Sequence, residues 1–171
     1  GLLIASINDP NPVMFLEHKK LYRKPDLKME VPIGLYEVEI GKANIVKEGS
    51  DVTLVAWSGM VPTALEAAAT LNNEDISVEV IDLRSIFPID EETILKSVEK
   101  TSNLVILQED VPFSSIASEI SSFVADKGFW TLDNPILKVT SPNTHIPFAP
   151  VLEDNFIPST ENVVKAIKEL Q

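Results

Sequence analysis

Cysteine is absent from the 171-residue sequence, which excludes disulfides, thiolate-bound zinc and cysteine nucleophiles. Glycine is scarce, and its six residues never adopt the G-x-G-x-x-G or P-loop spacing that cradles phosphates. No Gly-x-Ser-x-Gly elbow is present, so a serine hydrolase triad has no support. The usual sites for dinucleotides and nucleoside triphosphates are therefore excluded.

Basic residues are also few. Lysine and arginine number 14 against 26 aspartates and glutamates, which gives a formal net charge of −12. Nucleic-acid binding requires a basic stripe, so a phosphate-backbone ligand is excluded. The charge would suit a basic protein partner, although a solvated acidic surface that aids solubility explains the same composition.

Long apolar runs are missing as well. No stretch approaches the ~18 apolar residues of a membrane-spanning helix, and Leu2–Ile7 lacks the length and basic flank of a signal peptide. We therefore expect no membrane association and a cytosolic setting. The sequence begins at Gly1 without a methionine, and from this we expect a processed or truncated chain.

Apolar strands alternate with amphipathic stretches along most of the chain. The predicted strands cover residues 13–16, 52–57, 78–81, 103–107 and 136–139, with a small antiparallel edge at 37–40 and 43–46. Helices are predicted after residue 59, from residue 90, after a cap at Ser114 or Ser115, and over 161–170. An extended linker over 24–36 and a proline-rich loop before the last helix complete the prediction. On the first helix we expect Leu65, Ala68, Ala69 and Leu71 to face inward. This order predicts an α/β fold, a three-layer α/β/α sandwich with a mostly parallel sheet.

The stretch Val78–Asp90 (VEVIDLRSIFPID) combines a core strand, a polar strand end and a capped helix start. Asp82 and Arg84 follow the strand, where parallel sheets usually bind ligands. The alternative, which we favour, is an ion pair or backbone hydrogen bonds that fix the loop before Pro88. Two acidic pairs, Glu109-Asp110 and Glu153-Asp154, are candidate functional residues in exposed loops. Nothing in the sequence marks either pair as a general acid–base couple.

Histidine occurs twice, at His18 and His145, and the spacing does not predict a shared metal site. His145 lies in the proline-rich loop, where a structural or surface role is favoured. His18 follows the first predicted strand beside Glu17, at a possible active-site edge, but a structural role is again favoured. We therefore predict no catalytic, cofactor-binding or metal-binding residue in this chain.

Four segments together resemble a known family. They are NPVMFLEHKKLYR (11–23), IVKEGSDVTLVAWSG (45–59), VEVIDLRSIFPID (78–90) and HIPFAPVLEDNFIPS (145–159). In this order and spacing they resemble the beta subunit of the thiamine-dependent decarboxylase of 2-oxo acid dehydrogenase complexes, of the pyruvate or branched-chain type. The resemblance implies that residues 1–23 end a preceding thiamine-binding (pyrimidine-side) domain, that 24–36 form a linker, and that 37–171 form a transketolase-type C-terminal domain.

The resemblance also implies an activity. The intact enzyme oxidatively decarboxylates a 2-oxo acid and acylates the lipoyl arm of an acyltransferase, using thiamine diphosphate and magnesium in an alpha/beta heterotetramer. The family's cofactor-contacting glutamate and catalytic histidine fall outside this sequence, and its Gly-Asp-Gly magnesium signature belongs to the alpha subunit. We therefore expect no cofactor on this chain and no activity from it alone. In a eukaryote the implied compartment would be the mitochondrial matrix.

The implied partners are the alpha subunit, a second beta subunit and the small, basic subunit-binding domain of the acyltransferase. In the family, that last contact uses an acidic residue in an L-D-x-P-x-x-x-V segment, which here is Leu132–Val139, together with the carboxyl terminus of the subunit. Asp133 is the matching position, and a simple turn residue before Pro135 is the alternative. Ser114-Ser115 replaces the family's glycine pair, so that loop is expected to differ.

Two further interpretations remain open from the sequence. A transketolase or deoxyxylulose-phosphate synthase fragment would act on phosphosugars, which favour basic residues, and Arg84 is the single arginine of the main domain. A free-standing α/β binding module would have no enzyme context.

Overall fold

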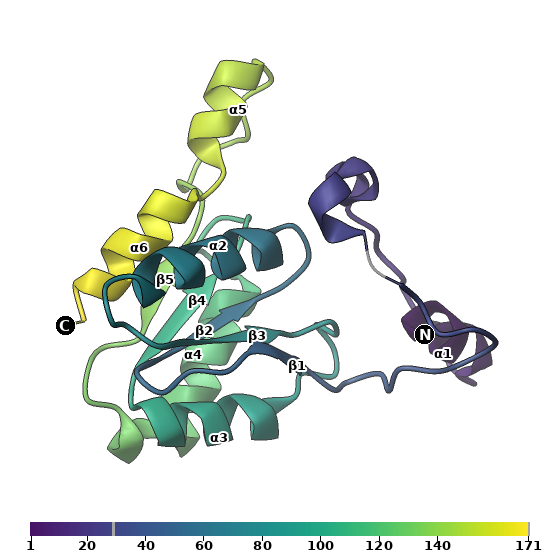
Figure 1. Ribbon diagram of the computed structural model, residues 1–171, viewed down its shortest axis with the longest axis horizontal. Helices are drawn as coiled ribbons and strands as arrows, with labels where there is room; N and C mark the ends of the chain where they lie inside the picture. The colour runs from purple at the N-terminus through teal and green to yellow at the C-terminus, as the bar shows by residue number, and fades with distance from the viewer. Residues whose placement is uncertain (29, 171) are drawn as a thin grey trace.

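The computed structural model describes residues 1–28 and 30–170, and its centre is a five-stranded sheet in the order β1-β3-β2-β4-β5 (Figure 1). β1 pairs antiparallel with β3, and the other neighbours are parallel. The strands are β1 (Asn44–Lys47), β2 (Val52–Ala56), β3 (Val78–Asp82), β4 (Leu104–Leu107) and β5 (Leu137–Val139). Residues 29 and 171, on which parts of the predicted linker and last domain fall, lie outside the described residues.

The central position of β2 in the sheet explains why its residues are mostly apolar. β2 lies between β3 and β4, with Val52 opposite Val78 and Leu54 opposite Val105, and all five of its residues are buried. Strands covered on both faces favour continuous apolar and β-branched runs. The four core strands predicted from such runs are therefore confirmed to within one residue at each end.

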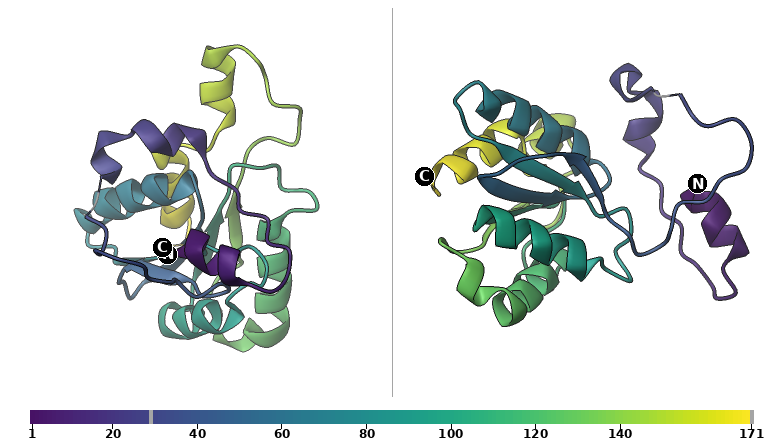
Figure 2. Two further views of the ribbon diagram at one scale, coloured as in Figure 1. Left: turned by 90° about the vertical axis from the view of Figure 1, so that its right-hand side faces the viewer. Right: turned by 60° about the horizontal axis from the view of Figure 1, so that its bottom comes forward.

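Helices cover both faces of the sheet, α2 (Met60–Asn72) and α6 (Thr160–Lys168) on one side and α3 (Glu91–Thr101) and α4 (Ile116–Lys127) on the other (Figure 2, right). Each layer has its own apolar core, one around Leu54 and Leu71 and the other around Ile81 and Ile94. The predicted three-layer α/β/α sandwich is confirmed. On α2, Ala64, Ala67 and Ala68 are buried against the sheet, as their small size predicts, whereas the prediction that Ala69 faces inward is wrong because Ala69 is exposed.

Side-chain caps fix where these helices begin. The Asp90 carboxylate accepts a hydrogen bond from the Thr93 N–H at 3.2 Å, and Ser115 caps α4 through the Ser118 N–H. Ser159 and Asn162 form a reciprocal capping box on α6. The start predicted at Asp90 is confirmed, and of the two caps predicted for α4, Ser114 and Ser115, the structure uses Ser115.

The N-terminal segment (residues 1–28 and 30–36) lies to one side of the sandwich (Figure 1). It contains α1 (Leu2–Asn8) and the 3-10 helices η1 (Lys19–Arg23) and η2 (Pro25–Leu27). The predicted buried strand at 13–16 is wrong, since these residues form no strand and Met14 and Leu16 are 86% and 84% exposed. No described strand lies beside them to pair their backbone, so apolar composition alone does not make a strand here.

Two further differences concern irregular parts of the chain. Residues 37–40 are not a strand, so β1 pairs with β3 and not with them. The predicted proline-rich loop contains a helix, α5 (Pro150–Phe156), because Pro150 sits in its tolerant first turn. In the described part of the chain, no helix is both long and apolar enough to cross a membrane.

Candidate functional site

The carboxyl edge of the sheet, where β2, β3 and β4 end, is the usual location of ligand sites in parallel sheets. A cavity of about 660 Å³ opens there between the strand ends and the N-terminal segment. Ser58 after β2 and Arg84 after β3 both line it, and both have positive φ, 52° and 54°. Non-glycine residues in this region cost about 1–3 kcal/mol each and persist only where surrounding contacts hold them.

For Arg84, those contacts are structural. Its N–H donates to the Asp82 carboxylate at 3.1 Å, and its guanidinium donates through Nη2 to the Ala43 carbonyl at 3.0 Å. The Ala43 N–H in turn donates to Asp90 at 3.0 Å. Arg84 and Asp90 therefore bind the carbonyl and the N–H of Ala43, and these two contacts fix the chain just before β1. Burial raises the pKa of the Asp82 carboxyl, and the Arg84 N–H and charge offset part of that rise.

The favoured structural role of Asp82 and Arg84 is thus supported. The sequence predicted contacts that fix the loop before Pro88, and the guanidinium in addition reaches the Ala43 carbonyl, just before β1.

A second contact at this edge joins residues 91 positions apart. His18 Nε2 lies 3.1 Å from Glu109 Oε2 and connects the N-terminal segment to the end of β4. A Cβ on Gly59, at the start of α2, would lie 2.9 Å from His18 Nε2 and 3.1 Å from Glu109 Oε2. Glycine at position 59 therefore allows the pair to sit against α2.

His18 contacts Glu109 through one of its two ring nitrogens. The other, Nδ1, is buried and has no hydrogen-bond partner among the described residues. The contact links the N-terminal segment to the end of β4, and both side chains also line the cavity of about 660 Å³.

Buried polar side chains hold the main chain around Glu109. The side chain of Gln108 donates to the Val111 carbonyl at 2.7 Å and accepts from the Ala117 N–H at 3.0 Å. The hydroxyl of Ser141 donates to the Glu109 carbonyl at 2.6 Å. The Glu109 carboxylate therefore projects from a fixed backbone.

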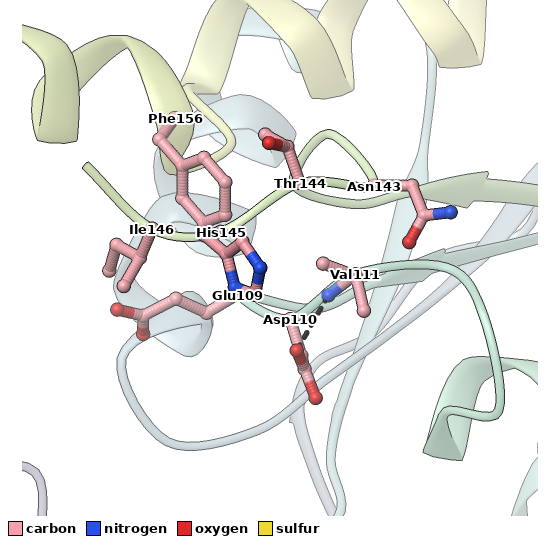
Figure 3. Close-up of a pocket in the computed structure, with 8 residues that line it drawn as sticks. All are labelled: Glu109, Asp110, Val111, Asn143, Thr144, His145, Ile146 and Phe156. Carbon is pink, nitrogen blue, oxygen red and sulfur yellow. Dashed lines mark hydrogen bonds between the residues drawn. The ribbon is translucent and has the colours of Figure 1, made fainter.

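On the other side of Glu109 lies a second cavity, of about 790 Å³ (Figure 3). His145 lines it beside Phe156 and Glu109, whereas the Asp110 carboxylate turns away and accepts from the Val111 N–H at 2.7 Å. Among the described residues, no group of three or more histidines and carboxylates could hold a metal ion. The other acidic pair lies on α5, where Glu153 binds Lys20 at 3.1 Å.

Magnesium in a diphosphate site is held by oxygen ligands, usually one or two carboxylates together with phosphate oxygens and waters. No described residue of this chain is assigned to thiamine diphosphate or its magnesium ion, and the absence of the cofactor from this chain stays a prediction.

Asp133 lies at the amino edge of the sheet, the edge opposite the cavities. Its side chain is exposed, and its N–H donates to the Ser102 carbonyl at 2.9 Å, just after α3. The neighbouring Asn134 side chain donates to Asn103 at 2.8 Å and to the Leu170 carbonyl at 3.2 Å. The segment around Asp133 is therefore fixed between the end of α3, the start of β4 and the last turn of the chain after α6.

At the loop before α4, Ser114 adopts φ of 49° and Ser115 serves as the helix cap. The serine at position 114 thus takes the left-handed conformation that glycine adopts most easily. The departure of this loop from the family's loop stays a prediction.

Residues 41–163 match the family model of the transketolase C-terminal domain. The chain belongs to the transketolase C-terminal domain family. A solved structure described as a split gene transketolase, inactive beta4 tetramer, is similar over 79% of this chain and 44% of its own, with a TM-score of 0.70 and 29% identity. The match leaves the predicted boundary at residue 37 as a prediction.

Curated relatives align over almost the whole chain. The beta subunit of acetoin:2,6-dichlorophenolindophenol oxidoreductase from Bacillus subtilis is 49% identical over 99% of this chain and 49% of its own length. The pyruvate dehydrogenase E1 component subunit beta of Acholeplasma laidlawii is 44% identical over 99% and 51%. The 2-oxoisovalerate dehydrogenase subunit beta of Bacillus subtilis is 37% identical over 99% and 52%. The chain spans about half the length of the curated relatives it matches.

The sequence did not indicate the pairing of His18 with Glu109, because nothing local relates positions 91 residues apart. The one available signal is Gly59, a glycine placed directly between a buried strand and a helix, which indicates a close approach.

Proposed function

We propose that this chain is the C-terminal assembly and docking part of the beta subunit of a thiamine-diphosphate-dependent 2-oxo acid dehydrogenase. The observation that supports this most strongly is the alignment of 170 residues with a pyruvate dehydrogenase E1 beta subunit at 44% identity. In the assembled enzyme, thiamine diphosphate with magnesium would supply the chemistry that breaks the bond beside the 2-oxo group. This chain would contribute binding surfaces and no catalytic group, in a cytosolic or matrix compartment.

Its surfaces suit that role. The N-terminal segment and α5 expose apolar side chains, among them Leu16, Val151 and Leu152, on the side of the molecule that carries the carboxyl edge. Such surfaces are typical of subunit contacts, and we assign them to the alpha subunit and the second beta subunit. Asp133, exposed at the amino edge, is assigned to the basic subunit-binding domain of the acyltransferase.

A second candidate function concerns the substrate of the whole protein. Two acetoin oxidoreductase beta subunits, at 49% and 47% identity, are more similar to this chain than the pyruvate dehydrogenase subunit at 44%. Acetoin is a hydroxyketone, so the whole enzyme would cleave a bond beside a ketone without first losing carbon dioxide. Turnover of the full enzyme with acetoin, pyruvate or branched-chain 2-oxo acids as the only substrate separates the two functions.

A phosphosugar enzyme and a free-standing binding module both receive less support. Phosphosugars favour several basic residues, and Arg84 is the single arginine of residues 37–171. No observation favours a free-standing binding module over a subunit.

Docking is tested by Asp133→Asn, which removes the charge and keeps the shape. We expect binding to the basic subunit-binding domain to weaken by about 1–3 kcal/mol, the usual effect of losing a charge-assisted contact. Isothermal titration calorimetry on the full-length subunit measures it, with Asp154→Asn on α5 as the control for a change of one exposed charge. Equal affinity for wild type and Asp133→Asn would remove Asp133 from the docking surface.

A further inference from the structure

The 3-10 helix η3 (Phe129–Thr131) exposes two aromatic side chains side by side. Trp130 is 94% exposed and Phe129 57%, and their rings meet edge to face with centroids 5.1 Å apart. Tryptophan is rarely left in solvent to this extent and is the residue type most enriched at binding hot spots. An uncovered pair of this kind indicates a contact with another molecule.

The pair lies next to Asp133. Asp133 follows Trp130 by three positions, so their Cα atoms are at most about 11 Å apart. Both ends of this stretch are fixed, since the Thr131 hydroxyl donates to the Gly128 carbonyl at 2.7 Å and the Asp133 N–H donates to Ser102. A partner that binds Asp133 therefore meets the aromatic pair on an ordered backbone, which lowers the entropic cost of binding.

The electrostatics of this corner favour a cation. Gly128 is the C-cap of α4 and Ser102 the C-cap of α3, so the carbonyl ends of two helices approach this surface. Lys127, three positions before Trp130, is paired with Glu91, whereas Asp133 forms no ion pair with any residue that the structure describes. The whole chain adds a net charge of −12.

We propose that Trp130, supported edge-on by Phe129, receives an arginine or lysine side chain of the basic partner that docks at Asp133. The inference rests on the docking role proposed above and names the second anchor of that surface. A cation over the face of an indole ring is attracted by its π-electrons, and an alkyl or guanidinium group covers the apolar ring at the same time. Asp133 would set charge recognition, and Trp130 would supply apolar contact that salt screens only weakly.

The test compares Trp130→Ala, Trp130→Phe, Asp133→Asn and Phe148→Ala in the full-length subunit. Phe148 is fully exposed in the loop before α5 and is the matched control for loss of an exposed aromatic ring. Binding of the basic subunit-binding domain is measured by calorimetry at low and high salt. We expect Trp130→Ala to weaken binding about 3- to 30-fold, the range of a cation–π contact, with a smaller loss for Trp130→Phe and none for Phe148→Ala. The fold-loss from Trp130→Ala should persist at high salt, whereas that from Asp133→Asn should shrink.

The outcomes separate this inference from the docking role itself. If Asp133→Asn weakens binding and Trp130→Ala does not, docking stands and the aromatic anchor is wrong. If neither variant weakens binding, the docking role falls and the anchor falls with it. A loss for Phe148→Ala as large as for Trp130→Ala would also overturn the anchor, since the effect would then follow any exposed ring.

Discussion

The N-terminal segment and the sandwich are both rich in apolar residues, yet only the sandwich buries them. Every buried residue lies at Val52 or later, and none of the described residues before Val52 is buried. The run at 13–16 (VMFL) is as apolar as β2, but β2 has a paired strand on each side and helices on both faces. Burial is thus decided by neighbours, not by composition.

The two regions are connected in different ways as well. Inside the sandwich, apolar packing joins the layers, whereas the N-terminal segment reaches the sandwich through polar contacts, including His18 with Glu109 and Lys20 with Glu153. Exposed ion pairs contribute little to stability, typically about 0–1 kcal/mol. The position of the N-terminal segment should therefore depend on what covers it in the assembled protein.

The largest expected difference comes from truncating a leucine in each region. Leu54→Ala empties a fully buried site in β2 and should lower the free energy of unfolding by about 2–5 kcal/mol. Leu16→Ala, at a side chain that is 84% exposed, should change it by less than about 0.5 kcal/mol. Urea denaturation followed by circular dichroism measures both. A loss for Leu16→Ala similar to that for Leu54→Ala would show that the N-terminal segment unfolds with the sandwich core.

The same comparison shows what a sequence can predict. β2 to β5 were predicted because buried parallel strands need continuous apolar runs, and helix starts were predicted because Asp90 and Ser115 are good caps. The same rule predicted a strand at 13–16, and that prediction is wrong. A run of apolar residues does not reveal whether another strand lies beside it to pair with it.

The candidate site was less predictable for a related reason. Arg84 was placed correctly at a strand end, but its partner is the Ala43 carbonyl, and a backbone oxygen carries no sequence signature. The exposure of Trp130 was also not predicted, because an aromatic residue after a helix is equally compatible with a core position. Contacts that form only when distant parts of the chain come together cannot be predicted from local sequence patterns.

The next prediction concerns a buried ion pair of the sandwich. The Glu79 side chain on β3 is 1% exposed and pairs with Lys100 of α3, while the ion pairs of the N-terminal segment are far more exposed. Lys100→Met leaves the Glu79 carboxylate buried without its cation and should cost about 3 kcal/mol at neutral pH. Lys96→Met, which removes an exposed pair with Glu92 one turn earlier, is the control and should cost less than about 0.5 kcal/mol.

The pH dependence of the same variants gives an independent check. Burial raises the pKa of Glu79, but hydrogen bonds from Lys100 and Ser97 outweigh it and leave the pKa below its ordinary value of 4.5. A carboxyl with a lowered folded-state pKa stabilises the protein above its unfolded value, and that stability is lost as the pH falls through the lowered pKa. Wild type should therefore lose this contribution below about pH 4.5. Lys100→Met removes the hydrogen bond and charge of Lys100, while burial still disfavours the charged carboxylate, so the pKa of Glu79 should rise. The variant should therefore lose less stability than wild type on acidification, and a slope equal to that of wild type would contradict this account.

The smallest effect is expected where the two regions meet, at Gly59. In Gly59→Ala the new methyl carbon would lie 2.9 Å from His18 Nε2, so the His18–Glu109 pair must separate. The free energy of unfolding should change by less than about 1 kcal/mol because the pair is partly exposed, but backbone amides of residues 13–23 should exchange with solvent faster while those of β2 stay protected. Hydrogen exchange read by mass spectrometry measures both regions in one sample. His18→Ala should give the same pattern without altering α2, and Lys20→Ala tests the exposed pair with Glu153 alone. Unchanged exchange over 13–23 in both Gly59→Ala and His18→Ala would mean that the His18–Glu109 pair does not hold the N-terminal segment in place.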